Sequence, residues 1–346
     1  MKLTADSPLW AWAYDAIDHR QETMLESAEG VREGTDIEAV HDMRVGSRRL
    51  VAAMRVFAGC FPAPEYRRLF REARGVTRKL GAVRDLDVLI DHYQRRRPKA
   101  EPDERLGIDY FVALHERERR KARRPMLRAL DKLERSGFSE RLQAFLRREA
   151  EEYRVGLDTY SVQARSTSRG ASSALGDSCI GPFREAAPGL LEERHAELYS
   201  FEEFTGQPDA VEELHEMRIA AKWLRYTMEL FAPAYEDELK RPIAAVKRIQ
   251  ELLGELHDSD VRLQILRELT TTRLDYRGLE AIGQMLPDPV EHGLSLLLAR
   301  EVRERQGCYR AFYKEWKKLE ERGFRKSCLE RLRNPDAVSE KKSIEN

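Results

Sequence analysis

The chain contains two copies of one sequence pattern. Residues 40–57 read VHDMRVGSRRLVAAMRVF, and residues 214–231 read LHEMRIAAKWLRYTMELF, at an offset of 174 residues. The aligned pairs include His41 and His215, Arg44 and Arg218, Arg48 and Lys222, and Phe57 and Phe231. Two more blocks align in the same order: LGAVRDLDV (80–88) with LGELHDSDV (253–261), and the residues from Arg117 onward with those from Arg303 onward. Matched blocks in one order indicate a tandem duplication.

Each copy has the sequence pattern of a helical bundle. Apolar residues recur at i, i+3, i+4 and i+7 over long stretches, and no stretch alternates over the length of a strand. We therefore expect an all-α fold made of two tandem helical-bundle repeats. The expected helices span about 8–29, 37–60, 64–81, 85–95, 105–135 and 139–160 in the first repeat, and 182–200, 209–232, 236–254, 258–270, 289–322 and 325–333 in the second.

Composition sets the expected boundaries and compartment. The first repeat is expected at 1–165 and the second at 182–335, with a Ser-, Gly- and Ala-rich linker at 166–181 and a polar tail at 336–346. No apolar run is long enough to cross a membrane, and the N-terminus lacks the apolar core of a signal peptide. The four cysteines form no CxxC motif, so we expect reduced thiols in the cytoplasm.

Charge is unevenly distributed along the chain. The whole sequence has 61 basic and 61 acidic residues, a formal net charge of zero. Residues 41–128 alone hold 23 basic and 12 acidic residues, whereas the segments on both sides are net acidic. Zero net charge argues against a uniformly basic nucleic-acid binder, but a focused basic region can still concentrate an anion.

The repeated helix is the strongest candidate for an anion-binding element. Its apolar residues share one face, and its cations share the opposite face. Like charges at i and i+4 destabilise a helix slightly, so a row of cations without interleaved acids is better explained by an external anion. The candidate ligands on the two copies are His41, Arg44, Arg48 and Arg55, and His215, Arg218, Lys222 and Arg225.

Two further rows of cations have the same helical spacing. Arg67, Arg71, Arg74 and Arg78 form the clearer row; the matching positions of the second copy are Lys240, Ala244, Lys247 and Glu251. Arg124 belongs to the other row, with Arg310 as its counterpart in the second copy. We therefore add Lys247, Arg124 and Arg310 to the candidates and expect the first repeat to be the more cationic.

These motifs resemble the CHAD family, the conserved histidine α-helical domain. The resemblance lies in H-x-x-R-x-x-x-R/K, in the L-G-x-x-x-D-x-D-V block about 30 residues later, and in the presence of two copies. It implies two helical bundles related by pseudo-two-fold symmetry around a basic cavity that binds inorganic polyphosphate, with the histidines and cations of both motif helices facing that cavity. It also implies a possible triphosphate tunnel metalloenzyme partner and association with polyphosphate granules. Val51 departs from the pattern, because its counterpart is Arg225.

The expected function is binding of polyphosphate without catalysis, cofactor or metal, with phosphate or sulfate ions as simpler ligands. Rows of guanidinium groups suit a linear polyanion, which has no base edges to read. Few aromatic residues interleave the rows, which disfavours base stacking and specific nucleic-acid binding.

Two alternatives stay open. One is a metal-dependent phosphohydrolase, suggested by His41-Asp42 and His257-Asp258. The other is an adaptor that docks an acidic protein or a nucleic acid. For Asp85, Asp87, Asp258 and Asp260, a structural role is preferred to a metal site: capping the following helix or orienting an arginine.

Overall fold

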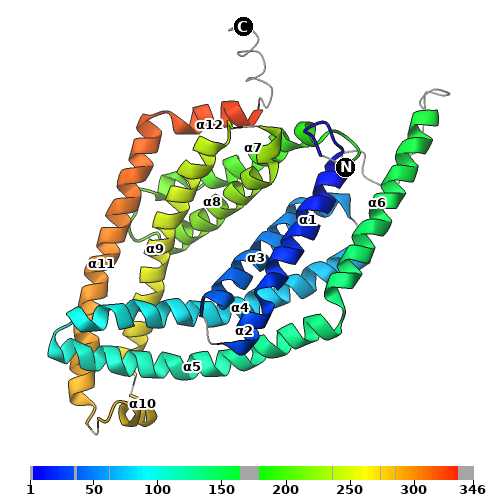
Figure 1. Cartoon of the computed structure of the whole chain (residues 1–346). Coiled ribbons are helices and arrows are strands. Elements are labelled where there is room, and N and C mark those ends of the chain that lie inside the picture. Colours follow the sequence, from blue (N-terminus) through cyan, green and yellow to red (C-terminus); the bar gives the residue numbers. More distant parts are fainter. Residues whose placement is uncertain are drawn as a thin grey trace.

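Long helices dominate the architecture of the computed structural model, which describes residues 3–34, 37–61, 63–163, 179–235, 237–272, 274–284 and 286–333. Within these ranges the regular elements are helices. One isolated β-bridge pairs Pro8 with Pro182. The first half contains α1 (Leu9–Glu26), α2 (Ala28–Glu33), α3 (Ile37–Val56), α4 (Pro64–Arg96), α5 (Pro102–Arg135) and α6 (Phe138–Gln163). The second contains α7 (Phe183–Tyr199), α8 (Val211–Phe231), α9 (Lys240–Thr271), α10 (Tyr276–Ala281), α11 (Asp288–Glu321) and α12 (Phe324–Arg333) (Figure 1). The all-α prediction is confirmed.

Two of the predicted helix breaks are wrong. α4 runs without interruption where helices at 64–81 and 85–95 were expected, and α9 does the same where a break near 256 was expected. Pro64 is the first residue of α4, where the backbone N–H that proline lacks would have no hydrogen-bond acceptor within the helix. Asp85 suggested a capped helix start, but it lies inside α4 and uses its carboxylate elsewhere. Each uninterrupted helix therefore places the L-G-x-x-x-D motif at its middle.

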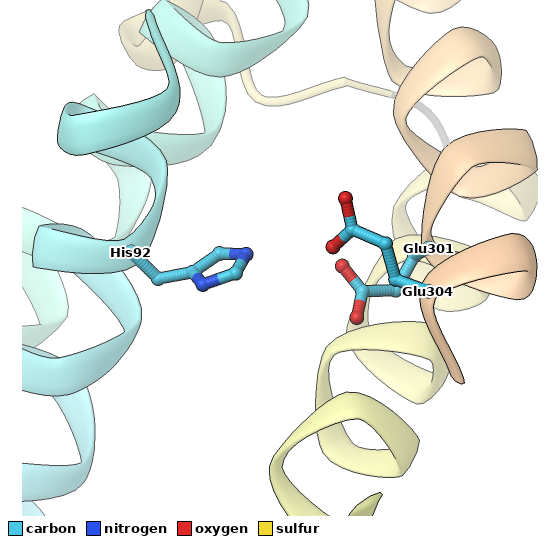
Figure 2. Close-up of side chains that lie close together, drawn as sticks. All are labelled: His92, Glu301 and Glu304. Atoms are coloured by element: carbon cyan, nitrogen blue, oxygen red, sulfur yellow. The ribbon is translucent and has the colours of Figure 1, made fainter. Parts of the chain in front are cut away.

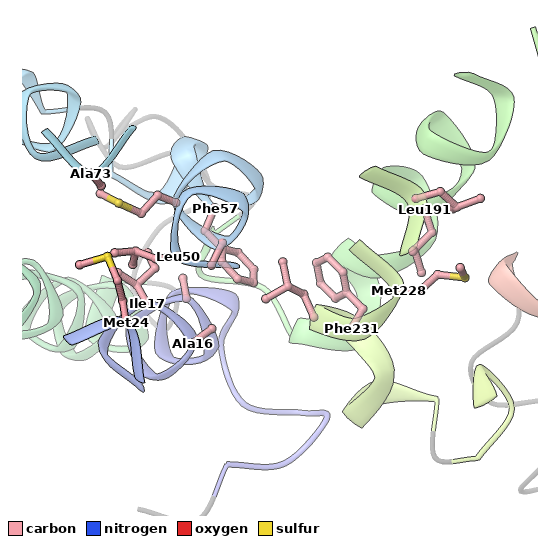
Figure 3. Close-up of a cluster of buried hydrophobic side chains, with 14 of the residues drawn as sticks. Ala16, Ile17, Met24, Leu50, Phe57, Ala73, Leu191, Met228 and Phe231 are labelled. Atoms are coloured by element: carbon pink, nitrogen blue, oxygen red, sulfur yellow. The ribbon is translucent and has the colours of Figure 1, made fainter. Parts of the chain in front are cut away.

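The larger hydrophobic core joins the two halves. α3 packs against α8, and the aligned residues Phe57 and Phe231 meet edge to face with ring centroids 5.9 Å apart. Phe183 at the start of α7 stacks on Phe231 at 4.8 Å. Figure 3 shows Phe57 of one half facing Phe231 of the other. This shared core fixes the two motif helices against each other.

A second core lies at the far end of the long helices. It combines α4 and α5 with α9, α10 and α11, and buries Tyr93 and Phe111 among Leu266 and Leu294. α5 and α11 cross so closely that a Cβ added to Gly107 would lie 2.5 Å from the carbonyl carbon of Gly293. Gly107 and Gly293 are also aligned at the offset of 186 residues. Any larger residue here would push the two helices apart.

The cysteines differ from the expectation. Cys60 and Cys179 form a buried disulfide between the end of the α3 region and the segment that precedes α7, whereas Cys308 and Cys328 are free. The expectation of four reduced thiols is wrong, because two cysteines far apart in sequence become neighbours where the halves meet. Residues 166–178 of the predicted linker and the tail at 336–346 lie outside the described residues. Within the described part, no helix is long and apolar enough to cross a membrane.

Candidate anion-binding site

The contact between α3 and α8 gathers cations from both halves. Arg44, Arg48 and Arg55 come from α3, and Arg218 and Lys222 come from α8; we call these five residues the cation cluster. Their electrostatic influence crosses between the halves. The positive charges of Arg48 and Arg44 lower the pKa of Arg218, after the larger effect of burial. The structure thus brings together five of the residues predicted from the repeat.

Two glycines make room for the arginines of the cluster. A Cβ added to Gly81 of α4 would lie 3.5 Å from Nε of Arg44, and one added to Gly254 of α9 would lie 4.0 Å from Nε of Arg218. Gly81 and Gly254 are the glycines of the repeated L-G-x-x-x-D block. We had predicted the block without assigning these glycines a role. The glycine itself could have indicated this role, because a glycine inside a helix destabilises the helix and usually marks a position where another group packs closely.

In each repeat, the first aspartate of the L-G-x-x-x-D block faces the arginine of the motif helix, Arg44 in the first repeat and Arg218 in the second. Arg44 donates to Oδ1 of Asp85 over 2.9 Å. Asp258 is the carboxylate with the largest opposing effect on the pKa of Arg218. Asp85 therefore orients an arginine, which was one of the two expected roles, and Asp258 acts on Arg218 through its charge. Among the described residues, the five cations of the cluster nevertheless face only these two carboxylates, so positive charge is in excess.

Lys222 is the residue on which this excess acts most strongly. Burial, followed by the positive charges of Arg48, Arg218, Arg44 and Arg55 in that order, lowers its pKa to about 8. At an effective dielectric constant near 20, two like charges about 6 Å apart repel by on the order of 3 kcal/mol. A bound anion would relieve this repulsion.

Aromatic rings of α8 lie among the cations, which corrects our expectation. The guanidinium of Arg55 lies 4.5 Å from the ring centroid of Trp223, and Nζ of Lys222 lies 5.7 Å from it. Arg48 and Arg225 lie 6.0 and 4.7 Å from the ring centroid of Tyr226. Such contacts disperse positive charge without an acid. The Arg55–Trp223 contact crosses between the halves, so the linear sequence could not show it.

The histidines differ between the two copies. His215 and His257 share a hydrogen bond between their Nδ1 atoms, 2.9 Å apart. Burial, followed by the charge of Arg218, lowers the pKa of His215 and lowers that of His257 to about 4. Both rings are therefore neutral at pH 7 in the free protein. His41 is half-buried on the same side of α3 as Arg44, and the position that matches His257 is Arg84.

The arginine row of α4 continues directly into the cation cluster. Arg67, Arg71, Arg74 and Arg78 are exposed, and on a helix of 100° per residue they share one side with Gly81 and Asp85. Among the described residues, Arg74 and Arg78 have no ion-pair partner. In α9 the corresponding side is neutralised, since Lys240 pairs with Asp237 at 2.8 Å and Lys247 with Glu251 at 3.8 Å.

Three other predicted residues do not join the cluster as free cations. Arg225 donates to Gln250 over 2.8 Å and to Glu229 over 2.5 Å. Arg124 is exposed on α5 and lines a shallow hollow with Arg117, Arg120 and Lys121, to which no residue of α3 or α8 contributes. Arg310 is exposed on the side of α11 opposite its buried Glu301 and Phe312. Helical spacing predicted the rows correctly but could not say which way each helix faces.

The group best suited to hold a metal lies away from this site. Among the described residues, only His92, Glu301 and Glu304 bring three ligand atoms within 4.8 Å of one another (Figure 2). Glu301 accepts hydrogen bonds from Arg262 at 2.9 Å and from Ser259 at 2.7 Å, and Arg96 pairs with Glu304. Arginines already neutralise these carboxylates, so the group fits an ion-pair network better than a metal centre. His41-Asp42 and His257-Asp258 take no part in it.

Comparisons with known proteins agree with the fold and the repeated motifs. The family model of the CHAD domain matches residues 15–267. The crystal structure of the CHAD domain from the plant Ricinus communis superposes with a TM-score of 0.60 at 23% identity, covering 85% of this chain and 94% of that one. PptA from Streptomyces chartreusis superposes with a TM-score of 0.56 at 12% identity, covering 90% of this chain and all of the other. No curated protein matches the sequence. The matched residues contain both copies of the histidine–arginine motif and both L-G-x-x-x-D blocks, and the chain therefore belongs to the CHAD domain family.

Proposed function

We propose that this protein binds inorganic polyphosphate, without catalysis, in a basic cavity between its two repeats. The observation that carries the proposal is the cation cluster, in which five cations of α3 and α8 face two aspartates. A fold stabilised by its own ion pairs would balance these charges. An excess of cations that is shared by both halves, with four of the five half-buried, supports an external polyanion as the missing partner.

The shape of the cationic surface favours a linear ligand. The row on α4 leads from Arg67 to Gly81, where Arg44 of the cluster is in contact. At 1.5 Å per residue, these 14 residues of helix span roughly 21 Å. A compact anion such as sulfate or phosphate can occupy the cluster but cannot follow the row. The matching side of α9 is neutralised, so the proposed track extends along the first repeat only.

The proposed pseudo-two-fold arrangement rests on contacts between aligned residues. Phe57 meets Phe231, and Gly107 lies against Gly293. Each half also repeats one ion pair, Arg119 with Asp87 and Arg305 with Asp260. A residue contacts its own counterpart only close to a two-fold axis. An axis through both contacts would place α3 and α8 on the two walls of one cavity.

Two activities compete with this proposal, and one is disfavoured. A metal-dependent phosphohydrolase needs free carboxylates, whereas the metal-capable group of the described residues is occupied by arginines. Nucleic acid is a closer competitor, because Trp223 and Tyr226 lie among the cations. The proposal includes a cytoplasmic location near polyphosphate granules and a triphosphate tunnel metalloenzyme as partner.

A titration with three polyanions tests the proposal. Trp223 lies beside Arg55 and Lys222, so its fluorescence should change when a polyanion binds. In the control variant Trp223→Phe, any remaining change in fluorescence comes from the three other tryptophans. We expect long-chain polyphosphate to bind more tightly than single-stranded DNA or ATP. If about six phosphates are contacted, affinity should fall by roughly three decades between 50 and 200 mM salt. Equal affinity for DNA, release of phosphate in the presence of divalent metal, or a flat salt response would contradict it.

A further inference from the structure

A groove of about 900 Å³ lies beside the proposed polyphosphate site, between α8, α9 and α11. An ion pair braces its walls: Arg305 of α11 binds Asp260 of α9 at 2.5 Å and donates to the carbonyl of Pro208 over 2.7 Å. Both side chains of this pair are nearly buried, at 12% and 13% exposure. The groove is therefore held open by packed groups and does not have to form when a partner arrives.

Exposed apolar residues converge in this groove from three helices. Val211 of α8, Val261 of α9 and Val302 of α11 are 40%, 39% and 38% exposed. They are three of the seven large hydrophobic residues that are exposed in the described part of the chain. Single exposed apolar residues are ordinary, but several that line one groove are typical of a surface that another molecule covers.

The charges around the valines select the kind of partner. Five acidic residues line the groove, and only Arg267 and Arg305 oppose them, the latter already paired with Asp260. The groove is thus net acidic, although it adjoins the cation cluster through His215 and His257. Polyphosphate would be repelled from it, whereas a segment carrying lysine or arginine would be attracted.

The first repeat contains the same groove without these properties. A hollow of about 370 Å³ is lined by the counterparts of the second groove's residues, with Arg119 and Asp87 forming the matching ion pair. There Glu116 stands in place of Val302, and Arg120 in place of Gln306. The fold alone therefore yields a small, charged hollow. The larger apolar groove comes from the side chains of the second repeat.

We propose that this second-repeat groove is a docking site for a short segment of a partner protein in which basic residues adjoin apolar ones. The wall formed by α9 runs from His257 to Glu268, about 16 Å at 1.5 Å per residue. This length accommodates about five residues of extended chain. The valines would receive the apolar side chains, and the acidic rim would hold the basic ones. A partner seated here would lie next to a ligand of the cation cluster.

Fluorescence polarisation with three synthetic peptides tests the docking site. The probe is a fluorescein-labelled 12-residue peptide in which lysines alternate with leucines. One matched peptide replaces the leucines with serines, and the other replaces the lysines with glutamates. We expect the first to bind at least tenfold more tightly than either matched peptide. Hydrogen exchange should slow at 257–268 and 302–306 on binding, and not at 84–95 and 116–120.

Variants of aligned residues provide the controls. Val261→Ser combined with Val302→Ser should weaken the lysine–leucine peptide about tenfold, and Glu212→Lys at least threefold. Val88→Ser, the counterpart of Val261 with 38% exposure, should have no effect. Polyphosphate binding should persist in all of these variants, which shows that they are folded. Equal binding of the lysine–serine peptide, equal loss in Val88→Ser, or self-association abolished by Val302→Ser would overturn the proposal.

Discussion

Two clusters of charged residues lie where the halves of this protein meet, and they are built in opposite ways. In the cation cluster, five positive residues share two aspartates. In the network around Glu301, the carboxylate is fully buried and binds Arg262 at 2.9 Å, with Arg96 and Glu304 paired beside it. The network balances its charges and serves the fold. The cluster has an excess of positive charge, which indicates a binding site for an anionic ligand.

The largest effect on stability should come from the balanced network. Glu301→Ala leaves Arg262, itself only 9% exposed, without its carboxylate. Breaking a buried pair from one side costs about 3–5 kcal/mol, so urea denaturation should show a loss of this order. Glu118→Ala changes an exposed residue of the first repeat, the counterpart of Glu304, and should cost no more than about 0.5 kcal/mol.

Polyphosphate affinity distinguishes the two roles in these variants. We expect the folded fraction of Glu301→Ala to bind polyphosphate as the native protein does, because the network is not part of the site. Weaker binding together with unchanged stability would mean that the network belongs to the binding surface, and the contrast between the two clusters would fail.

The opposite outcome is expected at Lys222. Its folded pKa of about 8, against an ordinary lysine value of 10.5, means that the unfolded chain binds the proton more tightly. This residue therefore opposes folding below pH 8, and the penalty fades as the pH rises to about 10.5. Lys222→Met should raise the free energy of unfolding at pH 7 by about 1–3 kcal/mol and lose this advantage near pH 10.5.

Binding should respond to Lys222 in the opposite sense. A bound polyanion favours the protonated amine, so native affinity should weaken as the pH rises through 8. Lys222→Met should bind about tenfold or more weakly at pH 7, because a charged hydrogen bond contributes about 1.5–3 kcal/mol. Lys222→Arg should retain affinity and bind independently of pH up to about 10. A Met variant that is less stable at pH 7 would argue against the charge excess.

The smallest effect is expected along α4. Arg74→Ala combined with Arg78→Ala should weaken long-chain polyphosphate by about fivefold, because exposed cations contribute on the order of 1 kcal/mol in total. Tripolyphosphate, which is too short to follow the row, should bind as before. Removal of two cations from the corresponding side of α9, by Lys240→Ala with Lys247→Ala, should have little effect, since acids already neutralise these lysines. Equal losses from both rows would show that the track is not one-sided.

The sequence predicted those features that follow from helical periodicity and from the internal repeat. The repeat aligned Phe57 with Phe231, and the structure places these rings in contact. The spacing of the motif predicted that Arg44 and Arg48 leave the core, and the L-G-x-x-x-D block identified Asp85. Each of these follows from positions along one helix, where 3.6 residues per turn fixes which side chains share a face.

What the sequence could not reveal depends on contacts between helices. Arg124 lies on a cationic row like that of α4, but its helix turns that row away from the site. The role of Gly81 needs Arg44 on the neighbouring helix. The contact of Trp223 with Arg55, and the disulfide of Cys60 with Cys179, both need the two halves in place. Long-range pairings of this kind are absent from helical periodicity.

One measurement tests the charge excess most directly: the melting temperature of Arg44→Ala/Arg48→Ala, with and without long-chain polyphosphate. Arg120→Ala/Arg124→Ala, which removes two exposed arginines of α5, is the matched control. We predict that the free Arg44/Arg48 variant melts at or above the native temperature, and that polyphosphate raises the melting temperature of the native protein and the control but not of this variant. A variant that melts well below the native protein, yet is still stabilised by polyphosphate, would show that these arginines support the fold and that the ligand binds elsewhere.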